Sequence, residues 1–166
     1  QTVTLIDTTP PEILCGKDRT VECGTPWSFD MPAATDLCGG TNVTLTILST
    51  VTNTGVCPVK FSVTRTWQAM DACSNSAACT QTITIADTTP PQLTCGHTLT
   101  VECGTAWNFT APSANDLCST NVTVRILGTI TNGCCGMTFT ATRTWEAFDD
   151  CSNRTVCSQT VNVLDT

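Results

Sequence analysis

The sequence predicts an all-β protein: two antiparallel β-sandwiches in tandem, each stapled by disulfides. The first observation is an internal repeat, in which Cys15 recurs 80 residues later as Cys95 and Cys79 recurs 78 residues later as Cys157. The second is a period of two between apolar and polar residues in short segments rich in Thr and β-branched residues, a pattern typical of half-buried strands. The third is that no segment combines a helical apolar stripe with caps, while Gly and Pro interrupt the chain often.

The chain begins with a strand motif that occurs three times. It returns as residues 81–86 and 159–164, although there are only two six-cysteine bodies. We therefore assign residues 1–6 to a surplus strand, 7–86 to a first repeat and 87–166 to a second repeat. The surplus strand is either the end of a preceding repeat or an assembly strand that adds to a sheet edge of another subunit. Its residues are Gln1, Thr2, Val3, Thr4, Leu5 and Ile6.

A proline pair follows, Pro10-Pro11 in the first repeat and Pro90-Pro91 in the second. Proline fixes φ and favours extended geometry in the residue before it, so we expect a short, stiff linker. These prolines could equally begin the first strand at a sheet edge.

The body of each repeat contains the clearest strands. In the first repeat, apolar and polar residues alternate over 43–47, 61–67 and 82–85. Each segment is short and rich in Thr, Val or Ile, which indicates strands with one face buried.

Thirteen cysteines without a C-x-x-C pair indicate disulfides formed in an oxidising compartment, so we expect an extracellular or cell-surface protein. Six cysteines in a repeat permit fifteen connectivities, and we expect local bridges Cys73–Cys79 and Cys151–Cys157. Cys134 has no counterpart in the first copy and could pair with another chain, bond to Cys135 or stay a thiol. The predicted framework is Cys15, Cys23, Cys38, Cys57, Cys73, Cys79, Cys95, Cys103, Cys118, Cys135, Cys151 and Cys157.

Four landmarks together resemble the hyalin repeat (HYR) family: 7–11 (Asp-Thr-Thr-Pro-Pro) with Cys15 soon after, Pro32 through 36–38 (Asp-Leu-Cys), 71–75 (Asp-Ala-Cys-Ser-Asn) and Cys79. The resemblance covers both repeats. It implies immunoglobulin-like β-sandwiches of the kind that serve extracellular proteins in adhesion and as spacers. Cys23, Cys57 and Cys73 are additional to the family pattern, so the resemblance implies no disulfide pairing.

Acidic residues recur at equivalent places in the two repeats. In an immunoglobulin-like topology some of them would meet at one pole, where carboxylates could bind a hard cation such as Ca²⁺. The alternative, which we favour because no calcium loop of fixed spacing is present, is that each carboxylate caps a turn. No cofactor is required by the sequence. These residues are Asp7, Asp36, Asp71, Asp87, Asp116 and Asp149.

Arg65 and Trp67, like Arg143 and Trp145, are two apart on a predicted strand and so face the same way. We expect the guanidinium either to stack on indole or to lie at the rim of the core.

Asn42, Asn108, Asn121 and Asn153 match the N-glycosylation sequon, although abundant Thr makes chance matches common.

The composition argues against several functions. Fourteen acidic against seven basic residues disfavour nucleic acid as a partner, and no apolar run reaches the length of a membrane span. No nucleophile motif or phosphate loop is present, and the single histidine, His97, stands where the first repeat has Lys17, so we expect no enzyme.

We therefore expect a structural subunit or segment of an extracellular fibre, stalk or surface array, assembled head to tail from rigid repeats. Its partners would be copies of itself or further covalent repeats. The alternative is an adhesin or carbohydrate-binding accessory module that recognises surface glycans; exposed Trp or Phe at loop tips would favour it.

Overall fold

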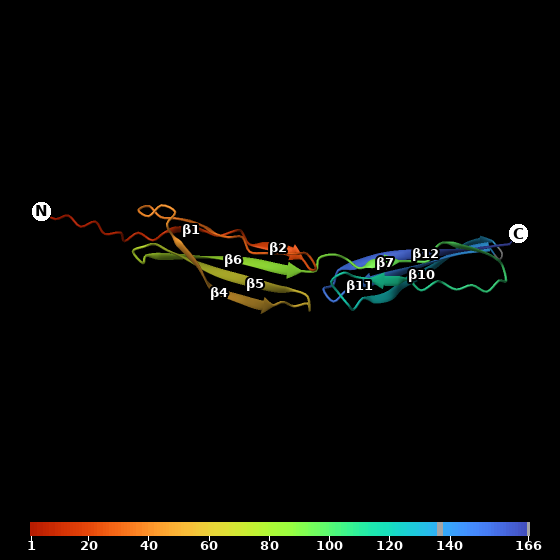
Figure 1. Ribbon diagram of the computed structural model, residues 1–166. Helices are drawn as coiled ribbons and strands as arrows, with labels where there is room; N and C mark the ends of the chain where they lie inside the picture. The colour runs from red at the N-terminus through yellow and green to blue at the C-terminus, as the bar shows by residue number, and fades with distance from the viewer. Residues whose placement is uncertain (136–137, 166) are drawn as a thin grey trace. The chain divides into compact units, whose positions relative to one another are not determined.

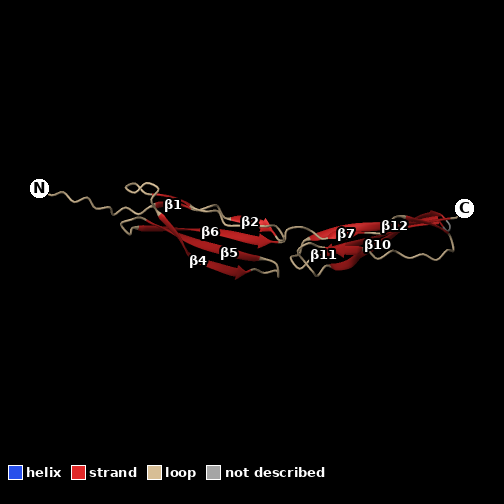
Figure 2. Ribbon diagram, in the orientation of Figure 1, coloured by secondary structure: helices blue, strands red, loops and turns tan. Residues whose placement is uncertain are grey.

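The structure is a computed structural model that describes residues 1–135 and 138–165, with the backbone alone for Cys134 and Cys135. Within these residues the only regular secondary structure is β-strand (Figure 2). The chain divides into two compact units, Gln1–Val56 with Lys60–Ala86, and Cys57–Val59 with Asp87–Thr166. The predicted class, two tandem immunoglobulin-like β-sandwiches with disulfides, is confirmed.

The first unit has a four-stranded sheet in the order β2-β6-β5-β4 and a two-stranded sheet of β1 and β3 (Figure 1). Consecutive strands β4, β5 and β6 pair antiparallel, as predicted, but β2 pairs parallel to β6. The strands are β1 (Glu12–Leu14), β2 (Arg19–Glu22), β3 (Ala33–Thr35), β4 (Thr44–Thr54), β5 (Phe61–Met70) and β6 (Ser76–Ala86).

The second unit repeats this plan, with a sheet in the order β10-β11-β12-β8 and a pair of β7 and β9. Here β8 pairs parallel to β12. The strands are β7 (Gln92–Thr94), β8 (Leu99–Glu102), β9 (Ser113–Asn115), β10 (Thr123–Cys135), β11 (Thr138–Phe148) and β12 (Arg154–Leu164).

The core of the first unit lies on one face of β5 and β6. Because side chains alternate across a strand, Val63, Trp67 and Ala69 of β5 point to the same face and are buried. Ile83 and Ile85 of β6 are buried with them. Burial of large apolar side chains is the main stabilising term in a domain of this size.

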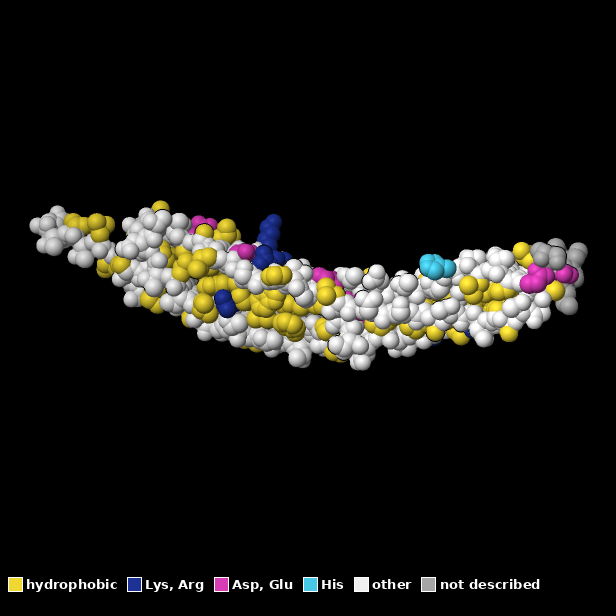
Figure 3. Space-filling view, turned by 45° about the vertical axis from the view of Figure 1, so that its right-hand side comes forward, with side chains coloured by type: hydrophobic (Ala, Val, Ile, Leu, Met, Phe, Trp, Pro, Cys, Tyr) yellow, Lys and Arg dark blue, Asp and Glu magenta, His cyan; other side chains and the backbone are white. Residues whose placement is uncertain are grey.

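Strand β4 is an edge of its sheet and buries little. A bulge between Ile47 and Ser49 inserts Leu48, and both Ile47 and Leu48 are exposed. Strand β10 repeats the feature, with a bulge after Ile126 and an exposed Leu127. Figure 3 shows apolar side chains gathered on one face of the first unit.

Residues 1–6 are extended, outside any sheet, with Leu5 96% exposed. Their counterpart, residues 81–86, forms part of β6, which lies between β5 and β2 rather than at a sheet edge. The motif is therefore built to complete the interior of a sheet.

The predicted bridges Cys73–Cys79 and Cys151–Cys157 are wrong. Cys79 bonds to Cys15 and Cys157 bonds to Cys95, with Cα atoms 5.8 and 5.9 Å apart. The physical reason is strand geometry: Cys73 lies in a turn, whereas Cys79 lies inside β6 opposite Trp67. A rise of about 3.3 Å per residue carries Cys79 out of disulfide reach of that turn.

A third disulfide joins Cys57 to Cys151. Cys23 and Cys118 are also disulfide-bonded. By contrast, Cys38, Cys73 and Cys103, which the sequence also places in the framework, have free thiols in this structure. The predictions for the side chains of Cys134 and Cys135 lie outside the described residues.

Candidate functional site

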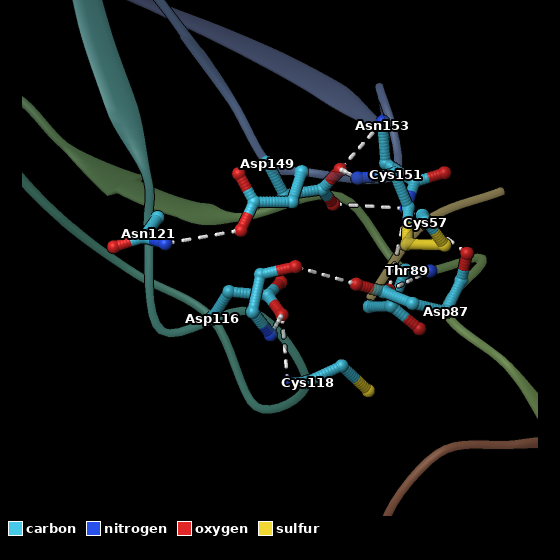
Figure 4. Close-up of a disulfide and its surroundings, with 11 residues drawn as sticks. Cys57, Asp87, Thr89, Asp116, Cys118, Asn121, Asp149, Cys151 and Asn153 are labelled. Carbon is cyan, nitrogen blue, oxygen red and sulfur yellow. Dashed lines mark hydrogen bonds between the residues drawn. A yellow bond between two sulfur atoms is a disulfide. The ribbon is translucent and has the colours of Figure 1, made fainter. Parts of the chain in front are cut away.

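A regular polar feature of each unit is the turn that joins β5 to β6 or β11 to β12. In the second unit this turn joins β11 to β12, and Asp149 Oδ1 accepts from the backbone N–H groups of Cys151 and Asn153 at 2.8 and 2.9 Å. Asn153 Nδ2 donates to Asp149 Oδ2 and to the carbonyl of Asp87 (Figure 4). Asp149 therefore caps the turn and, through Asn153, ties it to the segment that enters the unit.

Two further carboxylates lie beside this turn (Figure 4). Asp87, buried, accepts from Ser119 Oγ at 3.0 Å and from the N–H of Thr89. Asp116 accepts from the N–H groups of Cys118 and Ser119. Each of the three predicted acidic residues of this repeat thus caps a turn, which is the alternative we favoured.

The same three carboxylates also come together. Asp87, Asp116 and Asp149 each place one oxygen within 4.8 Å of the others. Burial raises the pKa of Asp87 above its ordinary value, and the negative charges of Asp116 and Asp149 raise it further. Oxygen ligands at this spacing are the kind a hard cation prefers.

The first unit repeats the arrangement at its own entry segment. Asp71 Oδ1 accepts from the N–H groups of Cys73 and Asn75, and Asn75 Nδ2 donates to the carbonyl of Asp7. Burial alone would raise the pKa of Asp71, but the hydrogen bonds from Asn75, Cys73 and Ser74 outweigh it and hold that pKa below its ordinary value.

Asp36 differs from its counterpart Asp116 in one respect. Its Oδ1 accepts from the N–H groups of Cys38 and Gly39, while its buried Oδ2 has no hydrogen-bond partner. Asp7, Asp36 and Cys38 each bring one ligand atom within 4.8 Å of the others. The charge of Asp7 is the largest cause that raises the pKa of the Cys38 thiol, followed by burial and Asp36.

Each unit also contains one buried glutamine that was not predicted from the sequence. Gln81 is fully buried; its Oε1 accepts from the N–H of Asp30, and its Nε2 donates to the carbonyl of Lys17 and to Asp30 Oδ2. Gln159 makes the matching bonds to Thr110 and His97. The signal was present, because Gln opens all three copies of the strand motif.

The Arg–Trp pairs form part of an aromatic cluster. The Arg65 guanidinium lies 4.3 Å from the Phe29 ring centroid and 5.9 Å from that of Trp67. Phe29 packs edge-on against both Trp27 and Trp67. Arg143 likewise lies 4.3 Å from the Phe109 centroid. Stacking therefore occurs, but its nearer ring is a phenylalanine that the sequence analysis did not name.

An open groove of about 400 Å³ borders this cluster in the first unit, lined in part by Phe29, Arg65 and Trp67. Trp67 and Trp145 are strand residues and buried. Trp27 is 37% exposed and lies outside the strands.

The four sequon asparagines differ in surroundings. Asn42, Asn108 and Asn121 are exposed. Asn153 is half-buried, and its amide nitrogen, the atom that a glycan would occupy, donates to Asp87 and Asp149. The structure therefore argues against glycosylation of Asn153.

His97 is exposed, and only its backbone carbonyl takes part in the Gln159 network. No helix of membrane-spanning length and apolarity occurs in the part of the chain that the structure describes.

Comparison with known proteins gives the following similarities. The HYR domain family matches residues 6–85. Hyalin of Strongylocentrotus purpuratus is 36% identical over 132 residues, which cover 70% of this chain and 10% of hyalin. The chain thus spans about a tenth of the length of that curated relative.

Among solved structures, mouse cadherin-23 EC22-24 is 16% identical, with a TM-score of 0.39, over 95% of this chain and 67% of that chain. The human desmocollin-1 ectodomain is 11% identical, with a TM-score of 0.35, over 95% of this chain and 42% of that chain.

Proposed function

Because residues 6–85 form an HYR-like repeat, we propose that this chain is a structural segment of an extracellular fibre, stalk or surface array, built head to tail from rigid immunoglobulin-like repeats. The observation that carries the proposal is that the second unit repeats the first in strand order, in its core disulfide and in its buried glutamine. Units of one design, joined in series, are typical of arrays.

Chemical equivalence of the two units also supports a structural role. A catalytic site would normally mark one unit with a nucleophile, a general base or a cofactor site. Here the acidic residues of each unit cap turns, and the His97 side chain replaces Lys17 at an exposed position. We therefore propose that the chain has no enzymatic activity.

Electron microscopy of the purified chain, before and after treatment with a reductant, tests this function. We expect filaments whose axial repeat is close to two domain lengths. Dispersed two-domain particles at all concentrations, with or without reductant, would contradict head-to-tail assembly.

A second candidate function, a binding module for surface glycans, is favoured by the groove beside Phe29, Arg65 and Trp67. Aromatic rings with a few polar groups are common in ligand sites. Binding to a glycan array that is lost in Arg65→Ala and retained in Leu48→Ala, an exposed edge-strand control, would support this candidate. If the unmodified chain bound no glycan on the array, this candidate function would be ruled out.

Calcium is a subsidiary proposal. The buried Asp36 Oδ2, unpartnered and grouped with Asp7, supports a cation site in the first unit. Cys38, which also belongs to that group in the first unit, would not be a calcium ligand because its sulfur is soft. In the second unit the oxygen donors would be Asp87, Asp116 and Asp149. A ligand that binds only the folded state raises the unfolding temperature.

Calorimetry with added Ca²⁺ tests this proposal. We expect the unfolding temperature to rise in the unmodified chain, and to rise less in Asp36→Asn and Asp116→Asn. Magnesium at the same concentration is the control for ionic strength. An unfolding temperature that does not respond to Ca²⁺ would leave turn capping as the sole role of these residues.

A further inference from the structure

The disulfides follow the internal repeat in a way that singles out the free thiols. We number the six recurring cysteines of each repeat by their order along the chain, leaving out Cys134, which has no counterpart in the first repeat. The positions are first (Cys15, Cys95), second (Cys23, Cys103), third (Cys38, Cys118), fourth (Cys57, Cys135), fifth (Cys73, Cys151) and sixth (Cys79, Cys157).

First and sixth positions bond within their own repeat, as Cys15–Cys79 and Cys95–Cys157. The fifth position behaves differently, because Cys151 bonds to Cys57, a fourth-position residue of the other repeat, 94 residues away. Its counterpart Cys73 is a free, exposed thiol. The fifth position thus takes its partner from a different copy of the repeat.

Second and third positions show the same division. Cys23 and Cys118, second in the first repeat and third in the second, are disulfide-bonded. Cys38 and Cys103, which hold the same two positions in the opposite repeats, are free. At each of these two positions, one repeat has a bonded cysteine and the other repeat has a free one.

An internal bond between Cys38 and Cys73 does not fit this rule. The two thiols are near enough that Cys73 adds to the causes that raise the pKa of Cys38. Their counterparts in the second repeat are Cys118 and Cys151, and Cys151 is bonded to Cys57 rather than to Cys118. The fifth position therefore bonds to another repeat and not to the third position of its own repeat.

The free thiols lie near Asp7 in the first unit and near the end of β12 in the second. Cys38 is beside Asp7, and Cys73 lies in the turn that Asn75 ties to the Asp7 carbonyl. Cys103 follows β8, and its N–H donates to the carbonyl of Leu164, at the end of β12. Two exposed thiols thus mark the entry to the first unit, and a half-exposed thiol marks the exit from the second.

We propose that Cys103 of one chain forms a disulfide with Cys38 of a second copy. This inference rests on the proposed head-to-tail function and names its covalent chemistry. This disulfide would cross-link successive chains, as the Cys57–Cys151 disulfide cross-links cysteines of different repeats within one chain.

The reaction balances with a small-molecule disulfide as oxidant. The Cys103 thiolate attacks one sulfur of the oxidant and expels one small thiolate. The Cys38 thiolate then attacks the Cys103 sulfur in the mixed disulfide and expels the second. In total, two protein thiols and one small disulfide give one protein disulfide and two small thiols.

Disulfide mapping of an isotope mixture tests the proposal. Equal amounts of chain with natural nitrogen and with nitrogen-15 are oxidised together, and non-reduced peptides are identified by mass spectrometry. We expect peptides joined through Cys38 and Cys103, about half of them carrying one label of each kind, as random pairing of two copies requires. Cys38→Ser and Cys103→Ser should each abolish these pairs.

Cys73→Ser is the matched control, because it removes an exposed thiol at the same end of the molecule but should leave the Cys38–Cys103 peptides. A Cys38–Cys73 bond, or Cys38–Cys103 pairs without mixed labels, would overturn the inference. Filaments that form while Cys38 and Cys103 remain thiols would overturn it too, yet leave the proposed function standing. Monomeric chain with no intermolecular bond would remove both.

Discussion

Among single residues, each buried glutamine joins segments that are far apart in the sequence. Gln81 joins the segment after β1 to the segment before β3, through Lys17 and Asp30. Gly16 is needed beside it, because a Cβ there would lie 2.6 Å from Gln81 Nε2. An amide side chain whose donor and acceptor groups are all hydrogen-bonded can be buried without a large free-energy cost. Its removal would leave its partners without hydrogen bonds.

We expect Gln81→Ala to lower the free energy of unfolding of the first unit by about 2–4 kcal/mol, because it removes a buried side chain and leaves the Asp30 N–H and the Lys17 carbonyl without partners. Chemical denaturation measures the change. Gln1→Ala is the matched control, since Gln1 opens the same motif but is exposed. Equal stability of the two variants would contradict the role given to Gln81.

The thiols of Cys38 and Cys103 differ from ordinary cysteines in their pKa. Asp7 raises that of Cys38, while burial and then Asp165 raise that of Cys103. A raised pKa means less thiolate at a given pH, and the thiolate is the reactive form. We expect alkylation of both residues to have a pH midpoint above that of cysteine in a short peptide, as followed by mass spectrometry.

Asp7→Asn supplies the internal control for that experiment. Removing the charge should move the midpoint of Cys38 down toward the peptide value and leave that of Cys103 in place. A midpoint for Cys38 that is unchanged by Asp7→Asn would contradict the electrostatic explanation.

The sequence was a good guide to the residues that stabilise the fold and a poor guide to the partners that they contact. Cysteines and aspartates were identified from the repeat, and turn capping by the aspartates was preferred. Cysteine pairing was not predictable, because it depends on which strand positions face each other, and the six positions of each repeat take partners both inside and outside it. Gln81 was missed because a polar residue in an alternating strand normally faces solvent.

Among the elements, the turn between β5 and β6 and its counterpart between β11 and β12 are the most alike. Each is capped by an aspartate, and each holds a serine at positive φ, 71° for Ser74 and 72° for Ser152. This conformation is costly for a residue other than glycine, so the surrounding hydrogen bonds must stabilise it. The turns therefore depend on their aspartates.

The pKa of Asp71 gives these turns a pH dependence. Because that pKa lies below its ordinary value, the charged carboxylate stabilises the fold above the ordinary pKa of 3.8, and the contribution is lost as the pH falls through the lower, folded-state pKa. We expect the stability difference between the unmodified chain and Asp71→Asn to shrink as the pH falls below about 4. Denaturation at a series of pH values measures it.

Asp87 should respond with the opposite sign. Its pKa is raised by burial and then by its acidic neighbours, so it disfavours folding as the pH rises above its ordinary value. Asp87→Asn should therefore gain stability relative to the unmodified chain as the pH rises toward neutrality. The same dependence in both variants would contradict these assignments.

Strand pairing was predicted in part. The alternation identified β5 and the end of β6, because long half-buried strands impose a clear period of two. The short strands β1 and β3 were not located, since three residues are too few to show a period. The parallel pairing of β2 with β6 was missed as well, because nothing local in a sequence distinguishes parallel from antiparallel neighbours.

At the scale of the whole molecule, the two units rely on matching cross-links. Cys15–Cys79 spans 64 residues and Cys95–Cys157 spans 62. Closing a loop of that length restricts the unfolded chain and stabilises the fold by about 4 kcal/mol in the chain-entropy model. Domains of this size have modest cores, so this is a large share of their stability.

We expect the double variant Cys15→Ala with Cys79→Ala to lose about 4 kcal/mol in the first unit, and Cys95→Ala with Cys157→Ala to lose a similar amount in the second. Calorimetry can assign the losses, since each variant should shift one transition more than the other. A loss confined to one of the two variants would show that the repeats are not energetically equivalent.

The position of the Cys15–Cys79 bond determines how a unit would respond to tension. A force that enters at Asp7 reaches Cys15 within a few residues, crosses the sulfur bridge to Cys79 and leaves along β6 to Ala86. Residues 16–78 form a loop beside this route, and the Cys57–Cys151 bond ties that loop to a second covalent path. The unit would then stretch like a short, nearly inextensible link, and reduction of Cys15–Cys79 would shift the load onto the strands and onto the Cys57–Cys151 bond.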